Sequence, residues 1–293
     1  MDLSREEALA WERRWAVPAA LAALAAIGFV IAAIFVASQG VGGGDGDAEL
    51  LRNVDAHRTA QIVSSILQAI GVGLLAAPLY YLFRAAAARS DDVRRQLVGV
   101  VIAAPLFLAV LAILSGISTL QAASDFVGDQ LPRLLAKGVA LNSEHANDLA
   151  SDAITDAPTR AYAAGFGFAG QLGFVVAMVY TCLHAMRTGL LTRFWGSLGM
   201  ALGAVSFIFF QFALLWFVYL GLLLIGRVPG GRPPAWESGE AEPWPTPAEK
   251  AAAEMAGPGA ELGEPPSGEP PPSGEPESSA RPGEPRRKRK QRD

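Results

Sequence analysis

The hydrophobic positions of this chain form long apolar runs, without the short alternation of strands or the narrow stripe of soluble helices. A bilayer core of ~30 Å requires about 20 apolar residues in a helix. Four runs meet this length and carry no charged residue near their centres: 16–38, 60–83, 97–120 and 161–185. The pattern therefore predicts an all-α, polytopic transmembrane helical bundle.

A fifth apolar run, residues 194–226, does not fit a single span. As one helix it is about 50 Å long, which exceeds the hydrocarbon thickness, whereas as two spans each half is shorter than the usual minimum of about 17 residues. A tight hairpin near Phe210 and Gln211 returns the chain to the side on which the run began. We therefore predict six transmembrane helices, and the alternative is five with one long, tilted helix.

The distribution of charge gives the predicted orientation. Cytoplasmic loops of membrane proteins are enriched in Lys and Arg, and here basic and acidic residues occupy alternate connections. The basic residues are Arg13, Arg14, Arg84, Arg89, Arg94, Arg95, Arg187 and Arg193, and the acidic ones Asp45, Asp47, Glu49 and Asp55. The N-terminus (1–15) and the C-terminus are therefore predicted to be cytoplasmic. Loops 39–59 and 121–160 are predicted to be external to a bundle that covers residues 16–227.

The chain has two regions of different composition. Overall it has 51% hydrophobic and 18% charged residues, below the ~25% charged residues of soluble domains. Residues 228–293 are instead rich in Pro, Gly, Ser and Glu and repeat PSGEP at 266–270 and 272–276. Such a segment buries too little apolar surface to offset the entropy of ordering, so we predict a disordered tail.

The tail ends in the basic stretch 286–292. It is interpreted either as a solvated charge run or as a site for anionic lipid headgroups, at about 1 kcal/mol per basic residue; a protein partner at the tail is also considered. No nucleic-acid partner is expected, because basic residues elsewhere are few and scattered. Cys182 is the only cysteine, so an intramolecular disulfide is excluded.

The stretch 165–170, GFGFAG, fits the dinucleotide fingerprint G-x-G-x-x-G. That fingerprint works after a strand and needs an acidic residue about 20 positions later, and neither is present here. Small residues at every fourth position instead predict faces where membrane helices approach closely. Spans two, four and five are expected to pack through these residues: Ser65, Ala69, Gly73 and Ala77; Gly165, Ala169, Gly173 and Ala177; Gly199 and Gly203.

Uncharged polar residues within the spans allow two interpretations. Gln61, Ser65 and Gln68 lie in the second span and Gln171 in the fourth. They are interpreted as interhelical hydrogen-bonding groups or as a pathway for a small polar or neutral solute. Titratable groups at membrane depth usually mark proton or ion coupling, and their absence from the span centres argues against that mechanism.

The second external loop contains carboxylates at every fourth position: Glu144, Asp148, Asp152 and Asp156. We predict a helix here with Asn142 or Ser143 as its N-cap and Pro158 beyond its end. The stripe is interpreted as a solvated helix face or as a weak divalent-cation site. The sequence indicates no dedicated metal or cofactor site, and no nucleophile, base and orienting group are found together.

The segments FWGSLGMALGAVSFIF (194–209) and LLLIGRVPGGRPPAWESGEAEPWP (222–245) resemble a group of uncharacterised actinobacterial multi-spanning membrane proteins. The resemblance implies a six-helix bundle and no particular chemistry, and an Ala-, Gly- and Arg-rich bacterial composition agrees with it. The expected function is a non-enzymatic membrane scaffold or sensor component. The alternative is a transporter of a small polar or neutral solute.

Overall fold

The computed structural model describes residues 5–39, 46–228 and 231–245, and over these residues the fold is all-α. The chain divides into two compact units, Met1–Trp244 and Pro245–Asp293. The predicted disordered tail lies, from residue 246 on, outside the described residues. The first unit therefore carries the structural account that follows.

Four helical segments of the described chain are long and apolar enough to cross a membrane, as the sequence predicts. The first is α1 (Arg5–Ser38), and the second joins α3 (Arg58–Leu74) to α4 (Ala76–Ala87). The third contains α5 (Val98–Asp125) and the fourth is α8 (Arg160–Arg187). These apolar helices identify an integral membrane protein.

Two prolines inside the predicted spans have different effects. Pro78 has no N–H to donate to the carbonyl of Leu74, four residues earlier, and the second span is interrupted at Leu75 between α3 and α4. Pro105 lies within α5, which runs without interruption from Val98 to Asp125. Pro78 therefore lies just after a break between two helices, whereas Pro105 does not interrupt its helix.

The fifth apolar run forms two helices, α9 (Arg193–Val205) and α10 (Phe210–Leu224). The break covers Ser206–Phe209, just before the hairpin position predicted at Phe210 and Gln211. With 13 and 15 residues, the helices are only about 20 and 22 Å long at 1.5 Å per residue. Each is therefore shorter than a ~30 Å hydrocarbon core.

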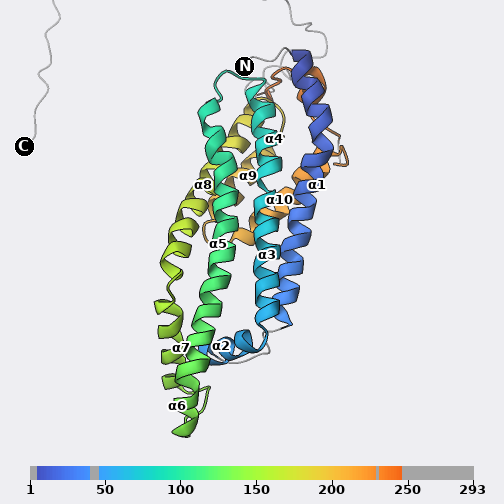
Figure 1. Ribbon diagram of the computed structural model, residues 1–293. Coiled ribbons are helices and arrows are strands. Elements are labelled where there is room, and N and C mark those ends of the chain that lie inside the picture. The colour runs from blue at the N-terminus through green and yellow to red at the C-terminus, as the bar shows by residue number, and fades with distance from the viewer. Residues whose placement is uncertain (1–4, 40–45, 229–230, 246–293) are drawn as a thin grey trace, which may run out of the picture. The chain divides into compact units, whose positions relative to one another are not determined.

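The bundle helices contact one another in a closed order. α1 packs against α3, α3 against α5, α5 against α8 and α8 against α9, while α10 contacts both α9 and α1. Figure 1 shows α1, α3, α5 and α8 side by side. Trp216, Phe217 and Phe174 are fully buried in the core that these helices share.

The predicted external loops contain helices of their own. α2 (Asp47–Ala56) lies in the first, and the second contains a π-helix (η2, Phe126–Gln130), α6 (Leu131–Ala136) and α7 (Glu144–Asp156). Together with the end of α5 they enclose a small second core that includes Leu51 and Phe126. We call this group the outer cluster; it lies at the end of the bundle opposite the N-terminus (Figure 1).

Candidate functional site

The small-residue stripe predicted for the fourth span contacts its neighbour differently from the expectation. A Cβ added to Gly165 would have no other heavy atom within 4 Å, and Ala169 is exposed. The close approach is made to α5, where a Cβ on Gly170 would lie 3.0 Å from the Leu108 backbone nitrogen and one on Gly173 2.9 Å from the Ala104 Cβ. Gly173 of the stripe lies at this contact and Ala177 is buried, and the contact continues through Gly167 and Gly170, which lie outside the stripe.

The stripe predicted for the second span is only partly buried. In α3, Ser65 is buried opposite Gly116 of α5, whereas Ala69 and Gly73 are half-buried, and Ala77 at the start of α4 is exposed. The second span therefore meets its neighbours through both of its helices: α3 packs on α5, as α8 does, and α4 packs on α5 and α8.

Close contacts in α9 do follow the predicted glycines. A Cβ on Gly199 would lie 2.5 Å from the Cys182 Sγ of α8, and one on Gly203 3.1 Å from the Met178 Cβ. α9 therefore approaches α8 through these two positions. Cys182 is itself fully buried beneath them.

The residues proposed for a polar pathway are not brought together. Ser65 Oγ donates to the Gln61 carbonyl (2.9 Å) within α3, whereas Gln171 Nε2 donates to the Ser206 carbonyl at the break between α9 and α10. Gln68 lines a cavity of about 150 Å³ between α1, α3 and α10, together with Ser64 and Gln211. Two of these residues thus make structural hydrogen bonds, and Gln68 lines a cavity.

The acidic helix of the outer cluster begins and ends as predicted. Ser143 Oγ accepts from the Ala146 N–H (3.3 Å) and caps α7. Glu144, Asp148, Asp152 and Asp156 are all exposed along its outer side. Within the described residues no group of three or more His, Cys, Asp or Glu is arranged to hold a metal ion. The geometry therefore favours a solvated face.

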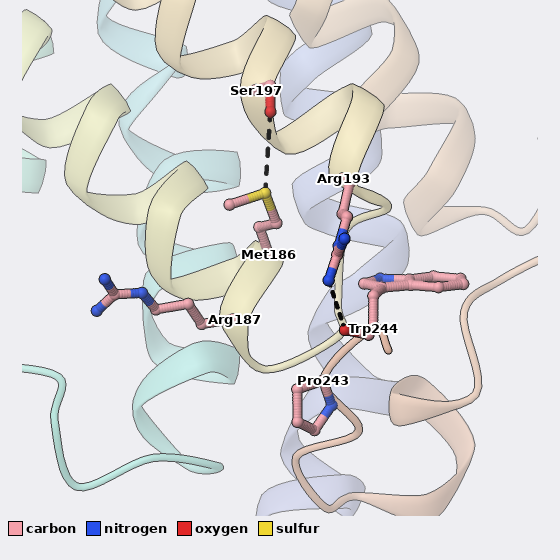
Figure 2. Close-up of a pocket in the computed structure, with 6 residues that line it drawn as sticks. All are labelled: Met186, Arg187, Arg193, Ser197, Pro243 and Trp244. Carbon is pink, nitrogen blue, oxygen red and sulfur yellow. Dashed lines mark hydrogen bonds between the residues drawn. The ribbon is translucent and has the colours of Figure 1, made fainter. Parts of the chain in front are cut away.

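The most extensive polar site is at the opposite end of the bundle, where residues 231–244 return to the helices. We call this segment the C-terminal strap. Trp236 Nε1 donates to the Leu190 carbonyl and Trp244 Nε1 to the Leu191 carbonyl, each at 2.9 Å. In return, Arg193 Nη2 donates to the Trp244 carbonyl at 2.8 Å (Figure 2). The strap is thus fixed to the turn between α8 and α9.

That turn requires a glycine at position 189. Gly189 has φ +77°, a left-handed conformation that L side chains rarely adopt. A Cβ there would also lie 2.8 Å from the Glu242 carbonyl carbon of the strap, whose N–H donates to the Thr188 carbonyl (3.2 Å). The turn therefore admits the strap only because this position has no side chain.

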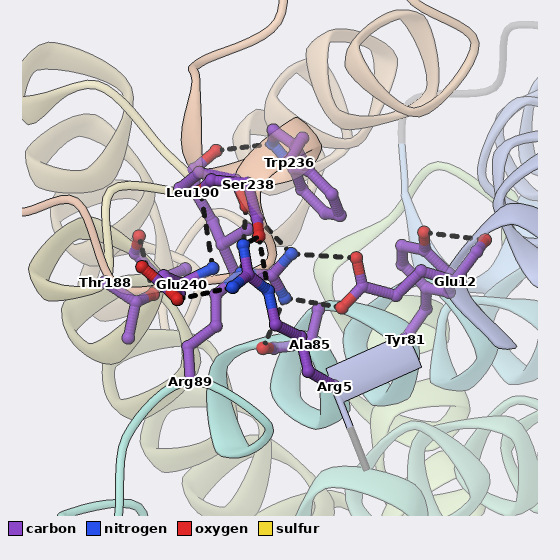
Figure 3. Close-up of polar contacts among 12 residues, drawn as sticks. Arg5, Glu12, Tyr81, Ala85, Arg89, Thr188, Leu190, Trp236, Ser238 and Glu240 are labelled. Atoms are coloured by element: carbon purple, nitrogen blue, oxygen red, sulfur yellow. Dashed lines mark hydrogen bonds and ion pairs between the residues drawn. The ribbon is translucent and has the colours of Figure 1, made fainter. Parts of the chain in front are cut away.

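The second attachment is a buried ion pair between Arg89, after α4, and Glu12 of α1 (Figure 3). Their side chains are 1% and 5% exposed. The pair is bidentate, and Arg89 Nη2 lies 2.9 Å from Glu12 Oε2. The same guanidinium donates to the carbonyls of Ala235 in the strap (2.9 and 3.0 Å) and Ala85 in α4 (2.9 Å).

These bonds use all five N–H donors of the guanidinium. A buried charge is costly unless paired and hydrogen-bonded, so Arg89 is stable there only while α1, α4 and the strap are assembled. Tyr81 Oη donates to the Glu12 carbonyl (3.0 Å), which fixes the same turn of α1. The arrangement is a structural junction, because none of its donors is left to act on a substrate.

Aromatic rings surround this junction. Tyr81 stacks between Trp11 (centroids 5.3 Å apart) and Trp236 (6.0 Å), and the Arg84 guanidinium lies 4.1 Å from the Trp11 ring centroid. Stacked rings and cation–π contacts add stability beyond the area that they bury. The ring of Trp236 thus joins the strap to α1 and α4.

The strap lies beyond the boundary that composition predicts at residue 228, and the first compact unit extends to Trp244. The prolines and glutamates of residues 231–244 resemble those of the tail that follows. A signal was nevertheless present in Trp236 and Trp244, because aromatic residues are depleted in segments that do not fold.

Comparison of the chain with protein-family models, curated proteins and solved structures found no match. The resemblance to actinobacterial membrane proteins therefore stays a prediction. The functional argument rests on the strap, the broken fifth run and the cavities of this structure.

Proposed function

We propose that this integral membrane protein is a non-enzymatic scaffold or sensor component that presents its C-terminal segment from a fixed point on the cytoplasmic face. The supporting observation is the strap. Its attachment to α1, α4 and the α8–α9 turn through Arg89, Trp236 and Trp244 fixes the chain up to Trp244. The first unit therefore ends at a defined position beside the bundle.

The proposal includes a membrane topology of four spans and one re-entrant hairpin. α9 and α10 are each too short to cross the bilayer, and they contact each other as well as α8 and α1. Their ends at Arg193 and Arg227 then lie on one side, which the positive-inside rule makes cytoplasmic. This topology is a third arrangement beside the six or five spans predicted from the sequence.

The break between α9 and α10 has the features that such a hairpin requires. Irregular backbone within hydrocarbon must satisfy its polar groups internally. At the break the N–H groups of Ile208 and Phe209 both donate to the Val205 carbonyl (2.9 Å), and Gln171 satisfies the carbonyl of Ser206. The side chains of Phe207, Ile208 and Phe209 are 47%, 75% and 53% exposed, which suits contact with lipid.

A transporter of a small polar or neutral solute remains the second candidate. The cavity of about 150 Å³ with Ser64, Gln68 and Gln211 in its wall supports it. This volume is below the ~300–1,000 Å³ of sites for drug-sized ligands, so a solute would have to be small.

Two measurements separate these functions. In intact cells, chemical cross-linking of the full chain is expected to capture defined proteins that a chain ending after Trp244 no longer captures, while both melt at the same temperature. In proteoliposomes, swelling in glycerol or urea is expected to match protein-free vesicles. Faster swelling that Gln68→Leu abolishes would replace the scaffold with the transporter.

A further inference from the structure

The strap and the α8–α9 turn enclose a second cavity, of about 390 Å³. Its walls are Met186 and Arg187 at the end of α8, Arg193 and Ser197 in α9, and Pro243 and Trp244 in the strap (Figure 2). This volume is within the range of small-molecule binding sites. The cavity plays no part in the scaffold argument above.

The polar groups of the cavity wall suit an anion. Arg187 and Arg193 are exposed and extend on either side of Met186, and none of the six wall residues is acidic. The Trp244 carbonyl takes one N–H of Arg193 out of the five that a guanidinium carries. The Ser197 hydroxyl, also exposed, contacts the Met186 sulfur at 4.0 Å. In Figure 2 the Arg187 guanidinium points away from Arg193, so Arg187 adds a positive charge at the rim, whereas Arg193 lies by the strap. An arginine and a hydroxyl beside a second positive charge favour phosphate, which arginine binds bidentately.

The position of the cavity indicates that its ligand also has an apolar part. It lies where α8 and α9 meet the end of the apolar segment, beside Phe194, whose side chain is 66% exposed. Trp244 and Met186 supply further apolar wall, and tryptophan is enriched at membrane–water interfaces. A ligand at this depth contacts water and hydrocarbon at once, so a phosphate joined to an acyl chain fits better than a free anion.

We propose that this cavity binds the headgroup of an anionic phospholipid, with its phosphate at Arg193 and Ser197, Arg187 as a second positive charge at the rim, and its acyl chains along α9 past Phe194. In the predicted orientation the lipid belongs to the cytoplasmic leaflet, which is rich in anionic lipids. Because Arg193 also holds Trp244, the bound headgroup lies against the end of the strap. The proposal is independent of the scaffold function and requires only the membrane location.

The test uses the full chain in phosphatidylcholine nanodiscs, with phosphatidylglycerol titrated in and bound lipids counted by native mass spectrometry. Arg187→Gln and Arg193→Gln are each expected to raise the dissociation constant of the tightest phosphatidylglycerol site about fivefold to tenfold. Ser197→Ala is expected to raise it less, because it removes one neutral hydrogen bond. Arg13→Gln, an exposed arginine outside the cavity, is the matched control and should leave that site within about twofold, since surface charge acts weakly at a distance.

Because Arg193→Gln also loosens the strap, Arg187→Gln and Ser197→Ala carry the decision if that variant does not fold. Equal losses in Arg187→Gln and Arg13→Gln would overturn the site in favour of general electrostatic attraction. Displacement of the lipid by inorganic phosphate at millimolar concentration would also overturn it, because the ligand would then be a free anion.

Discussion

The two ends of the bundle are stabilised by different chemistry. At the end with the strap, a buried Arg89–Glu12 pair and two tryptophan N–H groups bind residues far apart in the sequence. The outer cluster at the other end is mainly an apolar core of α2, α6 and α7, with single polar bonds such as Ala48 N–H to Asn147 Oδ1 (3.1 Å). Buried polar networks specify one arrangement more strictly than apolar packing does, so the strap end is the part of the bundle whose geometry is most tightly defined.

The largest loss of stability is expected from a substitution at the strap end. Arg89→Ala leaves Glu12 buried without its partner and should lower the free energy of unfolding by about 3–5 kcal/mol. Arg5→Ala removes the exposed Arg5–Glu240 pair of the same strap, with side chains 53% and 65% exposed, and the exposed Arg5 bonds to the Ser238 carbonyl. It should cost much less than Arg89→Ala, because exposed pairs contribute little. Thermal melting in detergent compares the two variants. Similar losses for both variants would mean that burial of the Arg89–Glu12 pair does not contribute to the stability of the bundle.

The bundle between the two ends is tested at a close contact between α9 and α8. Gly199→Leu places carbon where the Cys182 sulfur and the Trp216 indole already lie, and overpacking of this kind costs about 1–3 kcal/mol. Gly165→Leu is the matched control, since nothing lies within 4 Å of its Cβ position. If Gly165→Leu destabilises the protein as much as Gly199→Leu in the same melting assay, α8 packs through the stripe predicted from sequence.

A smaller effect is expected at the outer cluster. Asn147→Ala removes the acceptor for the Ala48 N–H and should cost about 1 kcal/mol. Asn142→Ala, at an exposed position before α7, is the control and should be nearly neutral. Hydrogen exchange is the suitable readout, with faster exchange confined to α2 and α7. Faster exchange in the strap as well would show that the two ends are coupled.

The smallest change concerns the tip of the α9–α10 hairpin. Gln171→Leu removes the donor to the Ser206 carbonyl, and interhelical hydrogen bonds in membranes contribute about 0.6 kcal/mol on average. Gln68→Leu, which lines the cavity instead, is the comparison. A small drop in melting temperature is expected for Gln171→Leu alone. Equal melting temperatures for the two variants would show that the Gln171 hydrogen bond does not stabilise the hairpin.

Hydrophobicity was sufficient to predict the four long helices, because hydrocarbon imposes a minimum length that few other structures meet. The N-cap of α7 could also be predicted, since Ser143 acts on the backbone three residues away. The strap could not, because its stability comes from Arg89 and Glu12, which are distant in sequence and look like ordinary ends of spans. The partners of the predicted packing faces could not be predicted for the same reason. Small residues show where another helix can approach, but not which helix does so.

The proposed function requires α9 and α10 to form a re-entrant hairpin, because the strap must reach the side of the membrane on which α4 ends. In a Cys182→Ala background, which has no cysteine, single cysteines at Asp91, Arg227, Ile208 and Ser151 are exposed to a membrane-impermeant maleimide in intact and opened cells.

We predict labelling of Ser151→Cys from outside, labelling of Asp91→Cys and Arg227→Cys only after the membrane is opened, and no labelling of Ile208→Cys within hydrocarbon. Labelling of Ile208→Cys from outside would show two full spans, and labelling of Arg227→Cys from outside would show one. Either result would contradict the re-entrant hairpin.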